Sequence, residues 1–249
     1  MSETKFNIAV LIDGDNAQAK LIKEFLEEVS KYGKATVRRI YGDWTVQNMN
    51  SWKDTVNQHS INPIQKFSYT TGKNSTDSAL IIDAMDILHS KIVDGFCIIS
   101  SDSDYTGLAK RIREEGLFVM GIGRKGTPIA FVNSCEVFTF SENLIPPPPP
   151  ATEALPKKHA GKKGQKTTLK KSFPAIDMNT IDKAFEISTN EDTGTDISKV
   201  GLSLRKIDPS FDPRTYGFKT LTQLFESLDK YVVLKNEVNG LNHPLVKLR

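Results

Sequence analysis

The sequence predicts two folded parts: an α/β sandwich of three layers around a mainly parallel sheet, then a small α+β winged helix-turn-helix. Three observations support this. In residues 1–145, short apolar runs alternate with helix-length amphipathic segments, which is typical of a parallel sheet covered on both faces. Residues 146–175 are rich in Pro and Lys, as in a linker. Residues 176–249 show helical stripes followed by strand-like runs.

In the first part, the apolar runs predict six strands, and apolar residues at helical spacing predict the helices between them. Gly33 and Gly116 are expected to end two of these helices. The expected strands are 7–13, 35–41, 64–69, 94–102, 117–123 and 136–140, and the expected helices are 17–33, 51–61, 75–91, 105–116 and 127–135. Ligands of such sheets bind beyond the carboxyl ends of the strands, so the site is expected there.

The charge of the chain is concentrated in residues 146–175. This segment has 7 Lys against one Glu, a net charge of +6, whereas the segments before and after it carry −2 and −1. Its five consecutive prolines favour polyproline II, and the Lys-rich stretch has too few apolar groups to fold. Two interpretations stay open: a solvated spacer, or a tether that attracts the phosphates of a nucleic acid.

Composition also excludes several classes of protein. No apolar run approaches the roughly 20 residues that span a bilayer, and the N-terminus lacks a signal-peptide pattern. The histidines show no zinc spacing. Cys97 and Cys135 lie in strand-like segments, which favours small core residues over a disulfide. We therefore expect a reducing, cytoplasmic location and no membrane partner.

Four carboxylates are expected to meet at one rim of the sheet. Asp13 ends the first strand, and Asp102 and Asp104 end the strand at 94–102. At about 3.6 residues per turn, Asp77 falls inside the apolar stripe of helix 75–91, where an unpaired charge would be costly. Carboxylates without His or Cys are ligands for Mg²⁺ or Mn²⁺, which can activate a water for attack on a phosphodiester.

The serines of the SDSD stretch allow a second interpretation. Ser101, Asp102 or Ser103 could simply cap the helix that follows, with Ser103 the most plausible cap. Asp77 in the first turn of its helix could likewise serve the helix dipole. Asp15 and Asp43 are further acids near the rim with no firm role, whereas Asp83 falls away from the apolar stripe of its helix and could be solvated or could support the site.

The ordered motifs LIDGDNAQ, YGDW, GKNSTDSALIIDAMDIL and ISSDSDYTGLAKRIREEG resemble the NYN domain, a branch of the PIN-like nucleases. The resemblance covers most of residues 5–140 and implies a PIN-like sandwich with metal-dependent ribonuclease activity. It implies four metal-binding and catalytic acids: Asp13, Asp77, Asp102 and Asp104. Candidate substrate contacts are Asn16, Lys73, Ser101, Ser103 and Trp44, the last by base stacking or else as a core residue.

In the last part, helices are expected at 181–188, 196–207 and 218–228, followed by two strands around a turn near Asn239–Gly240. The stretch VGLSLRKIDPSFDPRTYGFKTLTQLFES resembles the LOTUS domain, also called OST-HTH. That resemblance implies RNA binding or docking to a protein partner. Candidate RNA contacts are Arg205, Lys206, Arg214 and Lys219, although the −1 charge of this part argues against strong nonspecific duplex binding.

The sequence as a whole therefore favours a Mg²⁺- or Mn²⁺-dependent endoribonuclease with a C-terminal RNA-binding or docking module. The substrate would be single-stranded or structured RNA, and the domains would span 1–145 and 176–249 with the linker between them. Two alternatives stay open. One is an RNA-binding regulator without catalysis, and the other is a phosphatase-like enzyme, because Asp13-Gly14-Asp15 gives a DxD after the first strand.

Overall fold

The computed structural model describes residues 6–67, 75–145, 173–189, 194–238 and 241–249. Lys73, most of the expected linker, the end of the strand expected at 64–69 and the turn at Asn239–Gly240 lie outside these residues. Within the described ranges, no helix has the length and apolar character to cross a bilayer.

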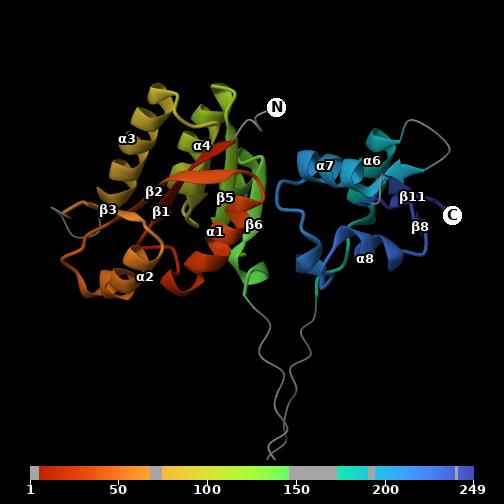
Figure 1. Ribbon diagram of the computed structural model, residues 1–249, viewed down its shortest axis with the longest axis horizontal. Coiled ribbons are helices and arrows are strands. Elements are labelled where there is room, and N and C mark those ends of the chain that lie inside the picture. The colour runs from red at the N-terminus through yellow and green to blue at the C-terminus, as the bar shows by residue number, and fades with distance from the viewer. Residues whose placement is uncertain (1–5, 68–74, 146–172, 190–193, 239–240) are drawn as a thin grey trace, which may run out of the picture.

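The first part is built on a six-stranded sheet in which every pair of neighbouring strands is parallel, in the order β3-β2-β1-β4-β5-β6 (Figure 1). The strands are β1 (Asn7–Asp13), β2 (Lys34–Gly42), β3 (Asn62–Gln65), β4 (Gly95–Ile99), β5 (Phe118–Gly123) and β6 (Val137–Phe140). The central strands β1 and β4 are almost entirely buried, which explains why their sequences are continuous apolar runs.

Helices cover both faces of the sheet, so the expected three-layer sandwich is confirmed. On one face lie α3 (Ser75–Ser90), α4 (Thr106–Glu114) and α5 (Ile129–Ser134), whose buried residues share one core cluster with Ala9 and Leu11 of β1. On the other face lie α1 (Ile22–Ser30) and α2 (Lys53–Gln58), with Ile8, Val10 and Ile12 of β1 in the same cluster. Side chains of one strand alternate between the faces, and each face has its own core.

The C-terminal part combines helices with small antiparallel sheets and has a separate core. Its elements are α6 (Met178–Ser188), β7 (Thr195–Asp196), α7 (Ile197–Ile207), α8 (Leu221–Glu226), β8 (Tyr231–Leu234), β9 (Glu237–Val238), β10 (Leu241–Asn242) and β11 (Leu245–Leu248). The antiparallel strands after α8 form the predicted wing. Gly217 has a φ of 90°, a left-handed conformation that favours glycine at the turn before α8.

Short 3₁₀ helices account for most differences between the expected and observed elements. The helix expected at 17–33 is a 3₁₀ turn at Ala19–Leu21 followed by α1. Further 3₁₀ helices are Gln47–Trp52, Ser103–Tyr105, Ser141–Asn143 and Pro213–Tyr216. β4 ends at Ile99 rather than 102, so Ser100, Ser101 and Asp102 form a loop beyond the strand.

Candidate metal and nucleic-acid site

The carboxyl ends of β1 and β4 lie side by side and bring their following residues to one rim of the sheet. Ile12 of β1 is in register with Ile99 of β4, so Asp13 and Ser100 come next at the same level. Tyr41 of β2 is in register with Asp13 on the other side. The rim therefore lies where the open end of a parallel sheet is expected to bind ligands.

Asp13 is fully buried and its carboxylate is held by three donors. Oδ2 accepts hydrogen bonds from the amide of Asn16 at 2.7 Å and from the hydroxyl of Ser100 at 2.8 Å, and Oδ1 accepts from the backbone N–H of Asp15 at 3.2 Å. Burial raises the pKa of Asp13 above its usual value, although these donors oppose the rise. Asn16 therefore orients a site carboxylate.

Asp77, Asp102 and Asp104 form a three-carboxylate cluster. Each offers one oxygen, and these oxygens all lie within 4.8 Å of one another. Asp77 comes from the first turn of α3, Asp102 from the loop after β4, and Asp104 from the 3₁₀ helix Ser103–Tyr105 that follows this loop. Asp102 is partly buried and Asp104 is exposed, so the cluster opens toward solvent.

Tyr105 links this cluster to the core. Its hydroxyl donates a 2.6 Å hydrogen bond to Oδ1 of Asp77, while its ring is fully buried. Burial raises the pKa of Asp77, the bond from Tyr105 opposes that rise, and the charges of Asp13, Asp102 and Asp104 add to it. Burial also raises the pKa of Tyr105, so this residue remains a neutral hydrogen-bond donor.

The serines differ in role from one another. Ser100, which the sequence did not single out, bonds Asp13 and accepts the N–H of Asp102 at 3.1 Å. The hydroxyl of Ser101 accepts the N–H of Arg124 at 2.9 Å. The helix cap expected at Ser103 is instead Asp102, whose Oδ1 accepts the N–H of Asp104 at 3.0 Å. Ser100 and Ser101 lie in the loop after β4 and Ser103 begins the 3₁₀ helix, so the spacing of the serines alone could not predict which one bonds Asp13.

Arg124 is a further residue at the rim that the sequence did not single out. It follows β5, is exposed, and donates from its guanidinium to the backbone carbonyl of Asn16 at 3.0 Å. The side chain of Asn16 in turn bonds Asp13, so Asn16 links this arginine to the buried carboxylate. The position of Arg124 just after the carboxyl end of a neighbouring strand is the sequence feature that could have identified it as a site residue.

The other candidate residues of the first part have structural partners. The indole N–H of Trp44 donates to the carbonyl of Ile64 at 3.2 Å, and its partly buried ring packs against the core on the α1 face. Asp43 accepts from Thr45 and from the amide of Gln65. Asp83, expected to lie away from the apolar stripe of its helix, accepts from Arg39 and Tyr41 of β2.

The four candidate RNA contacts of the C-terminal part lie on the side that faces the first part of the chain. Arg205 and Lys206 are exposed on α7, and the guanidinium of Arg205 lies 5.8 Å from the ring centroid of Tyr32. Lys219 is also exposed. Arg214 differs from the expectation: its guanidinium is bonded to carboxylates of Asp212 and Glu28.

The chemistry of the three-carboxylate cluster fits a hard divalent cation. All its donors are carboxylate oxygens, which suit Mg²⁺ and Mn²⁺ better than softer metals. Burial is the main cause of the raised pKa of Asp77, and the charges of the neighbouring carboxylates add to it; a bound cation would relieve their mutual repulsion.

Two family models match the two parts of the chain. The model of the NYN domain matches residues 7–142, and that of the OST-HTH/LOTUS domain matches residues 179–243. A crystal structure of a protein of unknown function from Vibrio parahaemolyticus is similar at 18% sequence identity, covering 55% of this chain and 94% of that one with a TM-score of 0.47. No curated protein matches the sequence.

The NYN domain implies a PIN-like nuclease fold, and the LOTUS domain points to RNA binding. The six parallel strands between helical layers have the PIN-like architecture, and the helices and wing account for the C-terminal match. Because the NYN match covers more than half of the chain, this protein belongs to the NYN domain family and carries a C-terminal OST-HTH/LOTUS domain.

Proposed function

We propose that this protein is a metal-dependent endoribonuclease that hydrolyses RNA phosphodiesters with Mg²⁺ or Mn²⁺. The observation that carries the proposal is the cluster of Asp77, Asp102 and Asp104 at the carboxyl end of a parallel sheet. When bound, a divalent cation supplies positive charge for the scissile phosphate and a more acidic water. The domain before residues 146–175 would cleave RNA, and the domain after them would bind it.

The residues of the rim would have distinct roles. Asp77, Asp102 and Asp104 would hold the cation, each through one carboxylate oxygen. The buried Asp13 would add negative charge behind them, with Asn16 and Ser100 fixing its orientation. Tyr105 would hold Asp77 in place through its hydroxyl. Such supporting hydrogen bonds orient metal ligands and tune their affinity.

Cations beside the carboxylates would receive the RNA backbone. Arg124 is exposed on the loop after β5 and donates to the carbonyl of Asn16, whose side chain bonds Asp13. Lys125 follows it and is also exposed. Arginine matches phosphate geometry through paired N–H groups. Ser101 positions the loop by accepting the N–H of Arg124.

The test is cleavage of end-labelled RNA, both single-stranded and structured, by the full chain with Mn²⁺ and with Mg²⁺. We expect internal cuts that are lost in Asp102→Asn and retained in Asp83→Asn, because Asp83 is paired with β2 rather than with the cluster. Chelation with EDTA should stop cleavage, and added Mn²⁺ should restore it.

The same assay distinguishes the alternatives. RNA binding without cleavage in the wild type and in Asp102→Asn, in either metal, would replace the nuclease with an RNA-binding regulator. Release of phosphate from small monoesters, with intact RNA, would replace it with a phosphatase. A cytoplasmic location and a protein partner of the OST-HTH domain remain predictions.

A further inference from the structure

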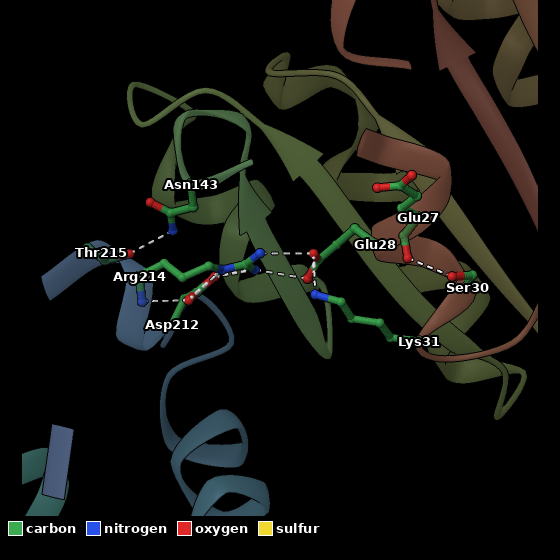
Figure 2. A network of polar contacts seen from close by, with 8 residues as sticks. All are labelled: Glu27, Glu28, Ser30, Lys31, Asn143, Asp212, Arg214 and Thr215. Atoms are coloured by element: carbon green, nitrogen blue, oxygen red, sulfur yellow. Dashed lines mark hydrogen bonds and ion pairs between the residues drawn. The ribbon is translucent and has the colours of Figure 1, made fainter. Parts of the chain in front are cut away.

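The two domains are joined by an ion-pair network that buries an acid of the NYN domain (Figure 2). The guanidinium of Arg214 donates to both carboxylate oxygens of Glu28 at 3.0 and 2.9 Å, and also to Asp212. Lys31 adds a 2.6 Å bond to Glu28, which is only 5% exposed. Removing one partner of such a buried pair is strongly destabilising, so the network favours a fixed arrangement of the domains.

Two further contacts accompany this network. The amide of Asn143 donates to the hydroxyl of Thr215 at 2.9 Å (Figure 2). The backbone N–H of Phe138, on the edge strand β6, donates to the carbonyl of Pro209 at 2.8 Å. The OST-HTH domain thus contacts the helix α1 side and the open edge of the sheet at once.

Beside these contacts lie two adjoining hollows of about 330 and 530 Å³ that share Tyr32, Val137 and Arg205. We call them together the interdomain groove. Their volumes are in the range of sites for small ligands or single nucleotide units. Both domains line each hollow, so the groove exists only while the domains are docked.

The groove has an excess of cations that come from both domains. The larger hollow is lined by Arg113, Arg205 and Lys206 and by one acid, Glu136, among the described residues. In the smaller hollow, Lys219 and Arg205 add to the lining, while its acids Glu28 and Asp212 are already bonded to Arg214. The unneutralised charge therefore attracts an anion.

An aromatic platform lies between the two hollows. The ring of Tyr32 stacks on that of Phe118 with centroids 5.5 Å apart and planes 25° from parallel. The guanidinium of Arg205 lies over the ring of Tyr32 at 5.8 Å. Cations that track a backbone, together with aromatic or guanidinium faces for bases, are the recognition elements of single-stranded nucleic acid.

We propose that the interdomain groove binds a segment of single-stranded RNA, separate from the segment that meets the carboxylate cluster. Lys206 and Arg113 contact phosphates, and a base stacks on the guanidinium of Arg205, which lies over the ring of Tyr32. The proposal rests on the proposed function in one respect only, that the chain acts on RNA. The groove needs both domains, so docking and RNA binding at this place support each other.

The experiment measures binding of a fluorescein-labelled oligouridylate of about 12 nucleotides to the full chain by anisotropy, with EDTA present to prevent cleavage. We expect Tyr32→Ala to weaken binding about 5- to 150-fold, the range for losing one stacked base, and Tyr32→Phe to bind normally. Circular dichroism and a thermal melt establish that each variant is folded.

A lysine pair on one helix tests the charges. Lys206→Ala should weaken binding and reduce the slope of log affinity against log salt by about 0.7, the value for one phosphate contact of a single strand. Lys199→Ala is the matched control, because Lys199 is exposed on the same helix α7 but does not line the groove. Equal effects of the two substitutions would overturn the proposal.

A second matched pair tests whether docking forms the site. Glu28→Gln and Glu27→Gln each remove one negative charge from α1, but only Glu28 contacts Arg214, whereas Glu27 is 66% exposed. We expect Glu28→Gln to weaken RNA binding although the protein becomes more positive, and Glu27→Gln not to weaken it. Tighter binding by Glu28→Gln than by Glu27→Gln would show instead that docking blocks RNA, and would overturn the proposal.

Failure of this inference is distinguishable from failure of the proposed function. If the groove variants lose RNA binding but neither they nor the wild type cleaves RNA, the groove proposal is supported and the nuclease proposal is wrong. If wild type cleaves RNA and the groove variants bind and cleave equally well, only the groove proposal falls.

Discussion

The hydroxyl of Tyr105 donates a hydrogen bond of 2.6 Å to the carboxylate of Asp77 and thereby connects the start of α3 to the 3₁₀ helix Ser103–Tyr105. The two residues are 28 positions apart in the chain. The bond fixes the direction of a carboxylate whose neighbours, Asp102 and Asp104, come from the same segment as the tyrosine.

Tyr105→Phe should reduce divalent cation affinity about 10- to 100-fold, the usual effect of losing a group that orients a metal ligand. The ring keeps its buried position, so the free energy of unfolding should fall by only about 1 to 2 kcal/mol. Titration calorimetry with Mn²⁺ measures the first effect and urea unfolding the second. An unchanged Mn²⁺ affinity would show that the hydroxyl has no part in orienting Asp77.

Mn²⁺ should raise the melting temperature of the wild type, because an ion that binds only the folded state stabilises it by mass action, by about 2.7 kcal/mol at 100 times Kd. Asp77→Asn and Asp102→Asn should each abolish most of this shift, since each removes one of three clustered carboxylates. Differential scanning fluorimetry measures the shift, with Ca²⁺ and Zn²⁺ for comparison. A shift of the same size in both variants would place the ion elsewhere.

Asp83→Asn should destabilise the protein by about 1 to 3 kcal/mol without changing Mn²⁺ affinity. Its carboxylate pairs with Arg39 and accepts the hydroxyl of Tyr41, so the substitution leaves a cation of β2 with a weaker partner. Urea unfolding and Mn²⁺ titration on the same preparation separate the two effects. Lost metal affinity at full stability would assign Asp83 to the metal site.

Glu28→Gln should loosen the contact between the domains, because the amide replaces a buried carboxylate that accepts from Arg214 and Lys31. Loss of one partner from a buried ion pair costs about 3 kcal/mol or more. If the domains separate, water reaches the remaining charged side chains and this cost becomes smaller, so we expect separation. Small-angle X-ray scattering should show a larger radius of gyration. Glu27→Gln, on the exposed side of the same helix, should scatter like the wild type.

Asp182→Asn should give a pH-dependent loss of stability in the OST-HTH domain. The hydrogen bond from Lys230 and then that from Tyr231 hold the pKa of Asp182 below its usual value of 3.8. A lowered folded-state pKa contributes stability that is present above pH 3.8 and lost as the pH falls through the folded-state value.

We therefore expect a difference of about 1 kcal/mol between wild type and Asp182→Asn at neutral pH, shrinking below pH 3.8. Urea unfolding at stepwise lower pH measures it. A difference that stays constant down to the acid transition would mean that the carboxylate charge contributes nothing.

Patterns local in the chain predicted much of the fold and part of the candidate site. The apolar runs at β1 and β4 predicted buried parallel strands, and strand ends pointed to Asp13 and Asp102. The helical phase of Asp77 predicted that it faces inward, and it lies beside Tyr105. These predictions depend on the repeat of about two residues in strands and 3.6 in helices, and on the rule that ligands bind at the carboxyl ends of parallel strands.

Other contacts had no local signal. Glu28 and Arg214 are 186 residues apart, and nothing in the spacing around either one indicates the other. Arg214 was a candidate RNA contact because it is a cation in the stretch that resembles the LOTUS domain, and an interdomain ion pair also uses a cation. Ser100, rather than its neighbours, bonds Asp13 because β4 ends at Ile99, and a sequence does not fix a strand end to one residue.

The contact between Phe138 and Pro209 also bears on the solubility of the chain. β6 is the last strand of the sheet, and a bare edge presents unpaired N–H and C=O groups that recruit strands from other molecules. The carbonyl of Pro209 takes up one such N–H, and proline has no N–H with which to extend the ladder. A chain cut before its OST-HTH domain would carry an uncovered edge, and we expect it to self-associate by strand addition.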